Sequence, residues 1–298
     1  MRPRGIIRIV TTALLFAVSL AEAGERLSVY TVNYPLQYFA QRIAGEQAEV
    51  TLPVPPAIDP AFWQPDVATI ANFQQADIIL LNGAGYAKWV NRVSLPRRKL
   101  VDTSAGFRDR YIHTEGDITH SHGREGDHSH AGTAFTTWLD FTLAGEQARA
   151  VAGALSRQRP VSKDRFERNL TALEKDLVDR ARPDPDSVGP NPGTLLLASH
   201  PVDQMFRRRY GLNLQSVMWE PEAMPDVAQW SALARLLMEH PAGWMVWEGK
   251  PAPESVARLR SMGIGSLVFD PCGNRPGAGD FLSVMQKNIA NLRRAYTN

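Results

Sequence analysis

The chain has 298 residues, of which 44% are hydrophobic and 21% charged, as in ordinary soluble globular proteins. Its 33 basic and 31 acidic residues nearly balance, and Arg2, Arg4 and Arg8 lie in a short N-terminal segment that holds a single acid, Glu22. The rest of the chain is therefore neutral overall, which excludes a protein that binds nucleic acid through an excess of lysine and arginine. The length favours two lobes of roughly 100–150 residues each.

The first 23 residues have the three parts of an export signal. Residues 2–8 are basic, 9–20 are apolar, and Ala21-Glu22-Ala23 forms a small-residue cleavage site. An apolar run of about a dozen residues is short of the roughly 20 that span a bilayer. We therefore predict a signal peptide over 1–23, cleaved after Ala23, and a periplasmic mature protein. The one cysteine, Cys272, can form no internal disulfide and is expected to be a packed core residue rather than a nucleophile or ligand.

From residue 27 onward, short apolar runs alternate with helical patterns. Strands are predicted over 27–32, 50–54, 78–81 and 100–101, and helical segments over 36–43, 66–75 and 86–90. This β-α-β order predicts a parallel sheet covered by helices. Residues 105–135 interrupt it with a stretch rich in Gly, Asp and His, which predicts a surface loop. A helix over 143–155 follows.

The second half repeats the alternation after a long helix. That helix is predicted from the spacing of Phe166, Leu170, Leu173 and Leu177, and the Pro/Gly-rich residues 183–193 end it. Strands are then predicted over 195–199, 214–219, 244–247 and 266–269, with helices over 202–210, 227–239, 254–262 and 281–292. We predict an α/β protein of two lobes, each with a mostly parallel sheet flanked by helices, joined by one long rigid helix. The predicted boundaries are 24–158 for the first lobe with a His-rich loop over 113–130, 159–183 for the linking helix, and 184–298 for the second lobe.

Polar side chains directly follow the strands of the second half. They are His200, Glu220, Glu248 and Asp270. Ligands of parallel α/β sheets bind outside the carboxyl ends of the strands, and imidazole with carboxylates is a donor set that suits a divalent cation. Any one of these residues, taken alone, is better explained as a helix cap or as a solvated edge residue. Four at successive strand ends make a candidate metal site.

Five of the seven histidines lie within 18 residues of one another, and four of them form two H-x-H pairs. They are His113, His120, His122, His128 and His130. Neutral imidazole is a common ligand of Zn²⁺ and also suits Cu²⁺. We predict that this tract captures metal; the alternative is a solvated low-complexity loop with no specific partner.

The order of several motifs across both halves resembles the zinc- and manganese-binding solute receptors of ABC importers, a cluster of the periplasmic binding proteins. The motifs include Gln75-Ala76-Asp77-Ile78 before a buried strand, Trp138-Leu139-Asp140 at a helix start, and Asp270-Pro271-Cys272-Gly273 after the last strand. The resemblance implies two α/β lobes bridged by a rigid helix, with one divalent metal held between them: zinc, or alternatively manganese or copper. It also implies a monomeric receptor that is not an enzyme and that works with a membrane permease and its ATPase.

The ligand set implied by the resemblance is only half present. Members usually supply two histidines from the first lobe, and a His or Glu plus an Asp or Glu from the second. Here the second-lobe pair is His200 and Asp270, whereas the first-lobe positions hold Ala61 and Thr136. Two such side chains cannot close a tetrahedral zinc site. We expect substitutes from elsewhere in the chain, and the candidates are His128, His130, Asp59, Glu248 and Glu220.

Other functions remain as alternatives at this point. The cleft could take a chelated metal or another small solute, with Trp63, Trp138 and Trp219 as its lining, although such residues are more often core. The loop alone could serve as a periplasmic metal buffer or chaperone. A hydrolase fits least, because the sequence has no H-E-x-x-H and no G-x-S-x-G motif. It also has no phosphate-binding G-x-x-x-x-G-K-[ST] loop, so transport would need partners.

Overall fold

The computed structural model describes residues 25–56, 58–114, 119–121, 127–129, 132–179, 193–201 and 204–297, with backbone alone at 114, 119–121 and 127–129. The predicted signal peptide lies outside these residues. No helix in this part of the chain is long and apolar enough to cross a membrane.

The first lobe contains a parallel sheet with the strand order β2-β1-β3-β4. Its strands are β1 (Leu27–Thr31), β2 (Ala48–Thr51), β3 (Ile78–Leu81) and β4 (Leu100–Asp102). The connecting helices are α1 (Tyr34–Ala44) and α2 (Val67–Gln75). Each begins at a polar cap: the side chain of Asn33 accepts from Leu36 N, and that of Asp66 accepts from Thr69 N.

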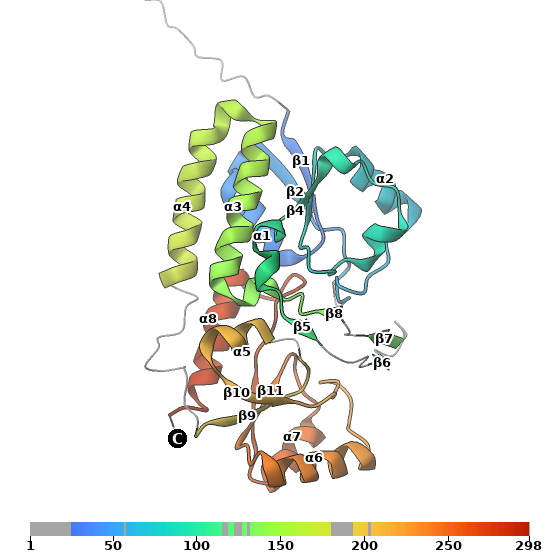
Figure 1. Ribbon diagram of the computed structural model, residues 1–298, viewed down its shortest axis with the longest axis vertical. Helices are drawn as coiled ribbons and strands as arrows, with labels where there is room; N and C mark the ends of the chain where they lie inside the picture. Colours follow the sequence, from blue (N-terminus) through green and yellow to red (C-terminus); the bar gives the residue numbers. More distant parts are fainter. Residues whose placement is uncertain are drawn as a thin grey trace, which may run out of the picture.

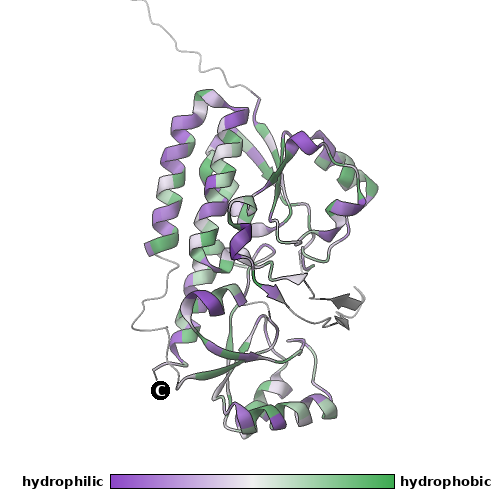
Figure 2. Ribbon diagram, viewed as in Figure 1, coloured by the Kyte–Doolittle hydropathy of each residue, from purple (hydrophilic) through white to green (hydrophobic). Residues whose placement is uncertain are grey.

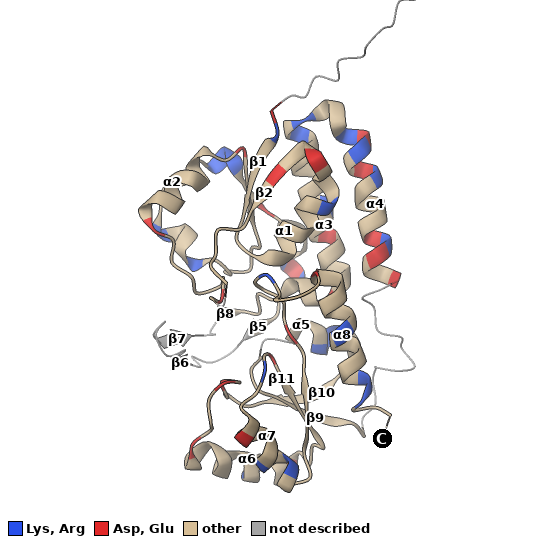
Figure 3. Cartoon of the chain, turned by 180° about the vertical axis from the view of Figure 1, so that it is seen from behind, with Lys and Arg blue, Asp and Glu red and all other residues tan. Residues whose placement is uncertain are grey.

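Two long antiparallel helices, α3 (Phe141–Gln158) and α4 (Lys163–Asp179), pack beside α1 (Figure 1). One face of α4 is buried through Phe166, Leu173 and Leu177, while the rest is mostly polar and carries both signs of charge (Figures 2 and 3). The described helix within the predicted range 159–183 is α4, which packs on α1 and α3 of the first lobe, and its predicted role as the link between the lobes stays a prediction. Residues 180–192 are outside the described chain, so the boundary predicted there stays a prediction.

The second lobe repeats the architecture with the strand order β10-β9-β11-β12, all parallel. The strands are β9 (Leu195–Ala198), β10 (Asn213–Ser216), β11 (Trp244–Trp247) and β12 (Gly265–Val268). The helices are α5 (Gln204–Tyr210), α6 (Val227–Glu239), α7 (Pro253–Ser261) and α8 (Phe281–Arg293). Helix α8 returns to the first lobe, where Phe281 packs edge-on against Phe39 of α1 at 5.4 Å between ring centroids. The fold class predicted from the sequence is confirmed.

One second-lobe histidine corrects an expectation. His240 precedes a proline, a pattern that predicts an exposed turn, but it is only 8% exposed, and its Nε2 lies 2.9 Å from the carbonyl oxygen of Leu196. The prediction was wrong because the imidazole is buried against the second-lobe sheet, where it is hydrogen-bonded to a carbonyl oxygen of β9.

The described part of the His-rich region forms two short antiparallel strand pairs. Strand β5 (His113–Thr114) pairs with β8 (Gly132–Thr133), and β6 (Thr119–Ser121) pairs with β7 (Asp127–Ser129). In the second pair His120 and His128 are register partners. The outer pair brings both ends of the loop to the place where the chain enters α3 through the 3-10 turn Thr137–Leu139.

Candidate metal site

A cavity of about 270 Å³ lies between the two lobes. Its described lining divides by lobe. The first lobe supplies Asp59, Pro60, Phe62, Tyr86, Phe135, Thr136 and Trp138, and the second supplies His200, Glu220, Glu248, Pro271, Gly273 and Asn274. One wall is therefore largely aromatic and the other carries an imidazole and two carboxylates.

His200 is the donor whose geometry is best defined. It is 2% exposed, and its Nδ1 lies 3.1 Å from the carbonyl oxygen of Trp219 and 3.1 Å from Oε1 of Glu248. A carbonyl oxygen can only accept, so these partners place the ring proton on Nδ1 and leave the lone pair on Nε2. Metal-binding histidines usually have this arrangement, in which one ring nitrogen is oriented by a carbonyl or carboxylate and the other faces the metal.

Two carboxylates lie beside that imidazole. Oε1 of Glu220 is 3.5 Å from Nε2 of His200, and the ligand atoms of His200, Glu220 and Glu248 all lie within 4.8 Å of one another. The three residues follow β9, β10 and β11, which are neighbours in the sheet. Trp219 N donates to Ser199 O at 2.9 Å and Glu248 N to Ser199 Oγ at 3.2 Å, so hydrogen bonds hold the three strand ends together.

Asp270 does not belong to this group. It is absent from the described lining of the cavity, and its Oδ1 accepts a hydrogen bond from Cys272 N at 2.7 Å. Its backbone is tied to the Asn288 side chain in both directions, at 2.9 and 2.7 Å. Burial raises the pKa of the Asp270 carboxyl above its ordinary value. The residue therefore braces a turn after the edge strand β12.

The cysteine prediction agrees with the structure. Cys272 is 2% exposed, and burial raises the pKa of its thiol, which keeps the sulfur protonated. Its φ is +57°, at the third position of the turn from Asp270 to Gly273, a conformation that favours glycine.

Of the two positions that lack first-lobe histidines, Thr136 lines the cavity and Ala61 does not. Ala61 is instead buried in the core at 2% exposure. Asp59, two residues before Ala61, also lines it and accepts from Ala61 N at 2.9 Å. The segment is fixed from the second lobe, because Asn274 Nδ2 donates to the carbonyl oxygens of residues 55 and 58 at 2.8 Å.

Of the three tryptophans expected to line the cleft, only Trp138 does so, and its Nε1 donates to Pro271 O at 2.7 Å. Trp63 packs against Trp89 at 6.2 Å, and Trp219 against Trp230 at 4.6 Å, so both side chains belong to lobe cores. At residue 219 the carbonyl faces the site while the indole points away from it. The lining rings Phe62, Tyr86 and Phe135 escaped sequence reasoning, although Phe62 and Phe135 directly adjoin Ala61 and Thr136.

The loop histidines are only partly described. The His113 side chain is exposed, and His120 and His128 are placed by backbone register alone. The predicted candidates His122 and His130 lie outside the described residues.

Comparison with known proteins points to one family. A family model described as "Zinc-uptake complex component A periplasmic" matches residues 29–295. The zinc-binding lipoprotein AdcA of Streptococcus pneumoniae is 23% identical over 292 residues, which cover 92% of this chain and 56% of that protein. The high-affinity zinc uptake system protein ZnuA of Bacillus subtilis is 25% identical over 222 residues, covering 73% of this chain and 69% of that one.

The fold is shared with solved structures. The metal-dependent lipoprotein YcdH of Bacillus subtilis superposes with a TM-score of 0.77 at 21% identity, covering 90% of this chain and 98% of that chain. The present chain spans little more than half the length of the AdcA relatives that it matches.

Proposed function

Because the chain belongs to the family of the periplasmic zinc-uptake complex component A, we propose that it is a receptor that captures a divalent metal ion, zinc first, in the inter-lobe cavity. It is not an enzyme in this proposal: it binds its cargo, closes and delivers it to a membrane permease driven by an ATPase. Two relatives carry zinc binding or zinc uptake in their names, which supports zinc over manganese or copper.

The observation that carries the proposal is the convergence of His200, Glu220 and Glu248 on one cavity. Nitrogen and oxygen donors of these kinds bind zinc at about 2.0–2.2 Å. Nε2 of His200 is the direct donor, and Glu220 lies on its side. Glu248 lies on the Nδ1 side, where it orients the ring. Asp59 is the acid that the first lobe brings to the same cavity.

The His-rich loop completes the proposal. His130 precedes the cavity residue Phe135 by five positions, and an extended chain of five residues spans up to about 18 Å. His128 and His130 are therefore within reach of the cavity as substitutes for the imidazoles that Ala61 and Thr136 do not provide. We assign His113, His120 and His122 to the initial capture of metal.

Export and partners follow from the same proposal. We infer that the signal peptide is cleaved after Ala23 and that the mature protein acts in the periplasm as a monomer. Mass spectrometry of the exported protein tests the cleavage position directly.

The decisive experiment is a zinc titration of untagged, exported protein, since a histidine tag would add sites. One tight site is expected, and at 100 times the dissociation constant it should stabilise the fold by about 2.7 kcal/mol. His200→Ala should weaken zinc binding by roughly 100-fold or more, beyond the range found for outer partners of a metal. His240→Ala, which also removes a buried second-lobe imidazole but lies off the cavity, should leave the affinity unchanged.

A loop variant separates the receptor from the buffer. Replacing His120, His122, His128 and His130 together by alanine should weaken the tight site and remove additional weak ones. If several weak sites vanish and no tight site ever depended on His200, the protein is a metal buffer that acts through its loop. If the tight site survives the fourfold change intact, the loop does not replace the missing ligands.

A further inference from the structure

The inference concerns Tyr86, and it rests on the proposed function of the cavity. Tyr86 lines the cavity from the first lobe and is only 2% exposed. Among the described residues its hydroxyl has no hydrogen-bond partner. A buried polar group without a partner destabilises a fold. A phenylalanine would avoid that cost, so the hydroxyl calls for an explanation.

The position of Tyr86 carries a second, independent cost. The three residues before it, Gly83, Ala84 and Gly85, all have positive φ values of 74°, 51° and 73°. Such a run is strained at Ala84, which has a Cβ atom. Backbone strain persists where surrounding structure enforces it, and it concentrates at functional sites.

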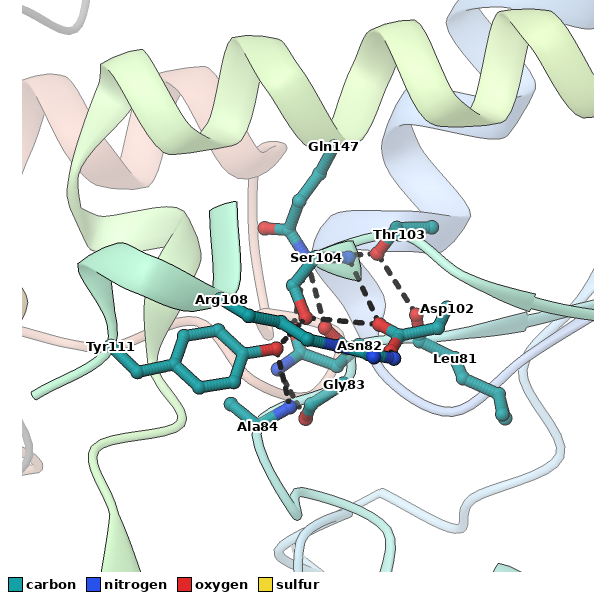
Figure 4. Close-up of polar contacts among 10 residues, drawn as sticks. All are labelled: Leu81, Asn82, Gly83, Ala84, Asp102, Thr103, Ser104, Arg108, Tyr111 and Gln147. Carbon is teal, nitrogen blue, oxygen red and sulfur yellow. Dashed lines mark hydrogen bonds and ion pairs between the residues drawn. The ribbon is translucent and has the colours of Figure 1, made fainter. Parts of the chain in front are cut away.

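A polar network braces this strained turn (Figure 4). Ala84 N donates to the hydroxyl of Tyr111 at 3.2 Å, and that hydroxyl is hydrogen-bonded to Ser104 Oγ. Ser104 Oγ donates in turn to Asp102 at 3.0 Å, and Arg108 pairs with Asp102 at 2.6 Å. Four side chains from the carboxyl end of β4 and beyond thus hold the turn that presents Tyr86.

The ring of Tyr86 is equally well fixed. It packs edge-on against Phe135 at 5.2 Å and against Trp138 at 5.5 Å. Its hydroxyl faces the second-lobe segment at Gly273, where an added Cβ would stand 3.3 Å from the phenolic oxygen. Glycine at 273 therefore leaves space beside the hydroxyl, at a residue that also lines the cavity.

The two walls of the cavity give this hydroxyl a role. A metal bound by His200 Nε2 beside Glu220 is held from the second lobe, and the opposite wall of the cavity belongs to the first lobe. The rings of Phe62, Phe135 and Trp138 offer no metal-coordinating atoms there, so Asp59, Thr136 and the Tyr86 hydroxyl are the polar groups of that wall. Burial, with the nearby charge of Asp59, raises the pKa of Tyr86 well above its ordinary value, so the group is a neutral O–H that donates a hydrogen bond.

We propose that Tyr86 is the first-lobe contact for the cargo's outer oxygen ligand: its hydroxyl donates to a water molecule or small carboxylate that the bound metal retains. Tyr86 then recognises the metal through the oxygen ligand that the metal carries, without coordinating the metal itself. Strain and the unpaired hydroxyl are both present before binding, and binding supplies the missing partner.

The test compares Tyr86→Phe with the unaltered protein, using zinc chloride as the only added metal. Without zinc, the variant should melt at the same or a higher temperature, because an unpartnered hydroxyl is gone. Its zinc affinity should nevertheless fall by about 3- to 10-fold, the range for one ordinary hydrogen bond. Tyr296→Phe is the matched control: burial raises the pKa of this phenol to about 12, yet it lies outside the described cavity lining, so zinc affinity should not change.

Two further arms sharpen the test. Gly273→Ala keeps the hydroxyl and fills the space beside it, and it should weaken zinc binding to a similar degree. Repeating the titrations with and without acetate identifies the oxygen ligand: a Tyr86-dependent gain in affinity with acetate indicates a carboxylate, and an unchanged difference between the two proteins indicates water.

Equal zinc affinities of Tyr86→Phe and the unaltered protein in both buffers would overturn the inference. The proposed function fails separately, because it requires loss of binding in His200→Ala whatever Tyr86 does.

Discussion

The two lobes share one strand order but contribute different things to the cavity between them. The second lobe presents an imidazole and two carboxylates at the ends of three adjacent strands. The first lobe presents aromatic rings, one acid and a neutral phenol. The same architecture thus supplies the clustered imidazole and carboxylates from the second lobe and a mostly aromatic wall from the first. The residues that follow the strands, and not the strands themselves, determine what a parallel sheet can bind.

This comparison predicts that first-lobe changes outside the cavity lining act mainly on stability, and Gly83→Ala, which lies outside that lining, should have the largest effect. A Cβ at this position would lie 1.8 Å from Ser104 Oγ, in a backbone conformation with φ of +74°. We expect the free energy of unfolding to fall by roughly 3 kcal/mol or more, as for other severe steric and backbone changes. Urea unfolding measures it.

Gly85→Ala is the matched control for that clash. It has nearly the same φ, +73°, but nothing lies within 4 Å of an added Cβ. Its free energy of unfolding should fall only by the cost of placing a residue with a Cβ atom in the left-handed conformation, about 1–2 kcal/mol. The zinc affinity of the folded Gly83→Ala protein should fall no further than that of Tyr86→Phe. A loss as large as that of His200→Ala would contradict the assignment of the direct metal donors to the second lobe.

The next largest effect is expected on the opposite side, from Glu220→Gln. Removing the carboxylate beside His200 Nε2 should weaken zinc binding by roughly 100-fold or more, above the range for partners outside the coordination shell. The zinc-free protein should keep its stability, because the change removes one of two negative charges that lie close together. Glu248→Gln should cost less, since Glu248 lies on the Nδ1 side. Isothermal titration measures both, and the exposed neighbour Glu222→Gln should change nothing. Destabilisation without loss of affinity in Glu220→Gln would contradict the assignment.

The smallest effect is expected from Asp270→Asn, a ligand candidate from the sequence that is not part of the described cavity lining. An asparagine Oδ1 still accepts from Cys272 N, so zinc affinity should change by less than about tenfold, the lower limit for a partner outside the coordination shell. A loss of 100-fold would restore Asp270 as a ligand.

The pH dependence of that variant has a definite sign. Burial raises the pKa of Asp270 above its unfolded value of 3.8, so the folded state binds this proton more tightly. The contribution of this carboxyl to the stability of the native protein therefore falls as pH rises from 3.8 through its raised pKa. Asp270→Asn lacks that loss, and at neutral pH it should be at least as stable; thermal melts at pH 4 and pH 7 compare the two.

Much of this molecule follows from local sequence. Alternating short apolar runs and helical patterns predicted the strands and helices of both lobes, because each element shows its own period along the chain. The rule that ligands bind after parallel strands singled out His200, Glu220, Glu248 and Asp270 from the sequence. The absence of histidine at residues 61 and 136 was equally evident, because the residue type at a position is read directly from the sequence.

Only the tertiary structure decided which of those residues meet. Strand order places β10, β9 and β11 side by side, about 4.8 Å apart, whereas Asp270 follows the edge strand β12 and turns its carboxylate into its own loop. Side-chain direction likewise placed the indole of Trp219 in the core and its carbonyl at the site. Tyr86 carried no sequence signal at all, because its importance lies in an unpaired hydroxyl and a strained turn. Local periodicity along the sequence determines the helices and strands. Contacts between distant segments depend on how those elements pack in the folded chain, and no local pattern specifies them.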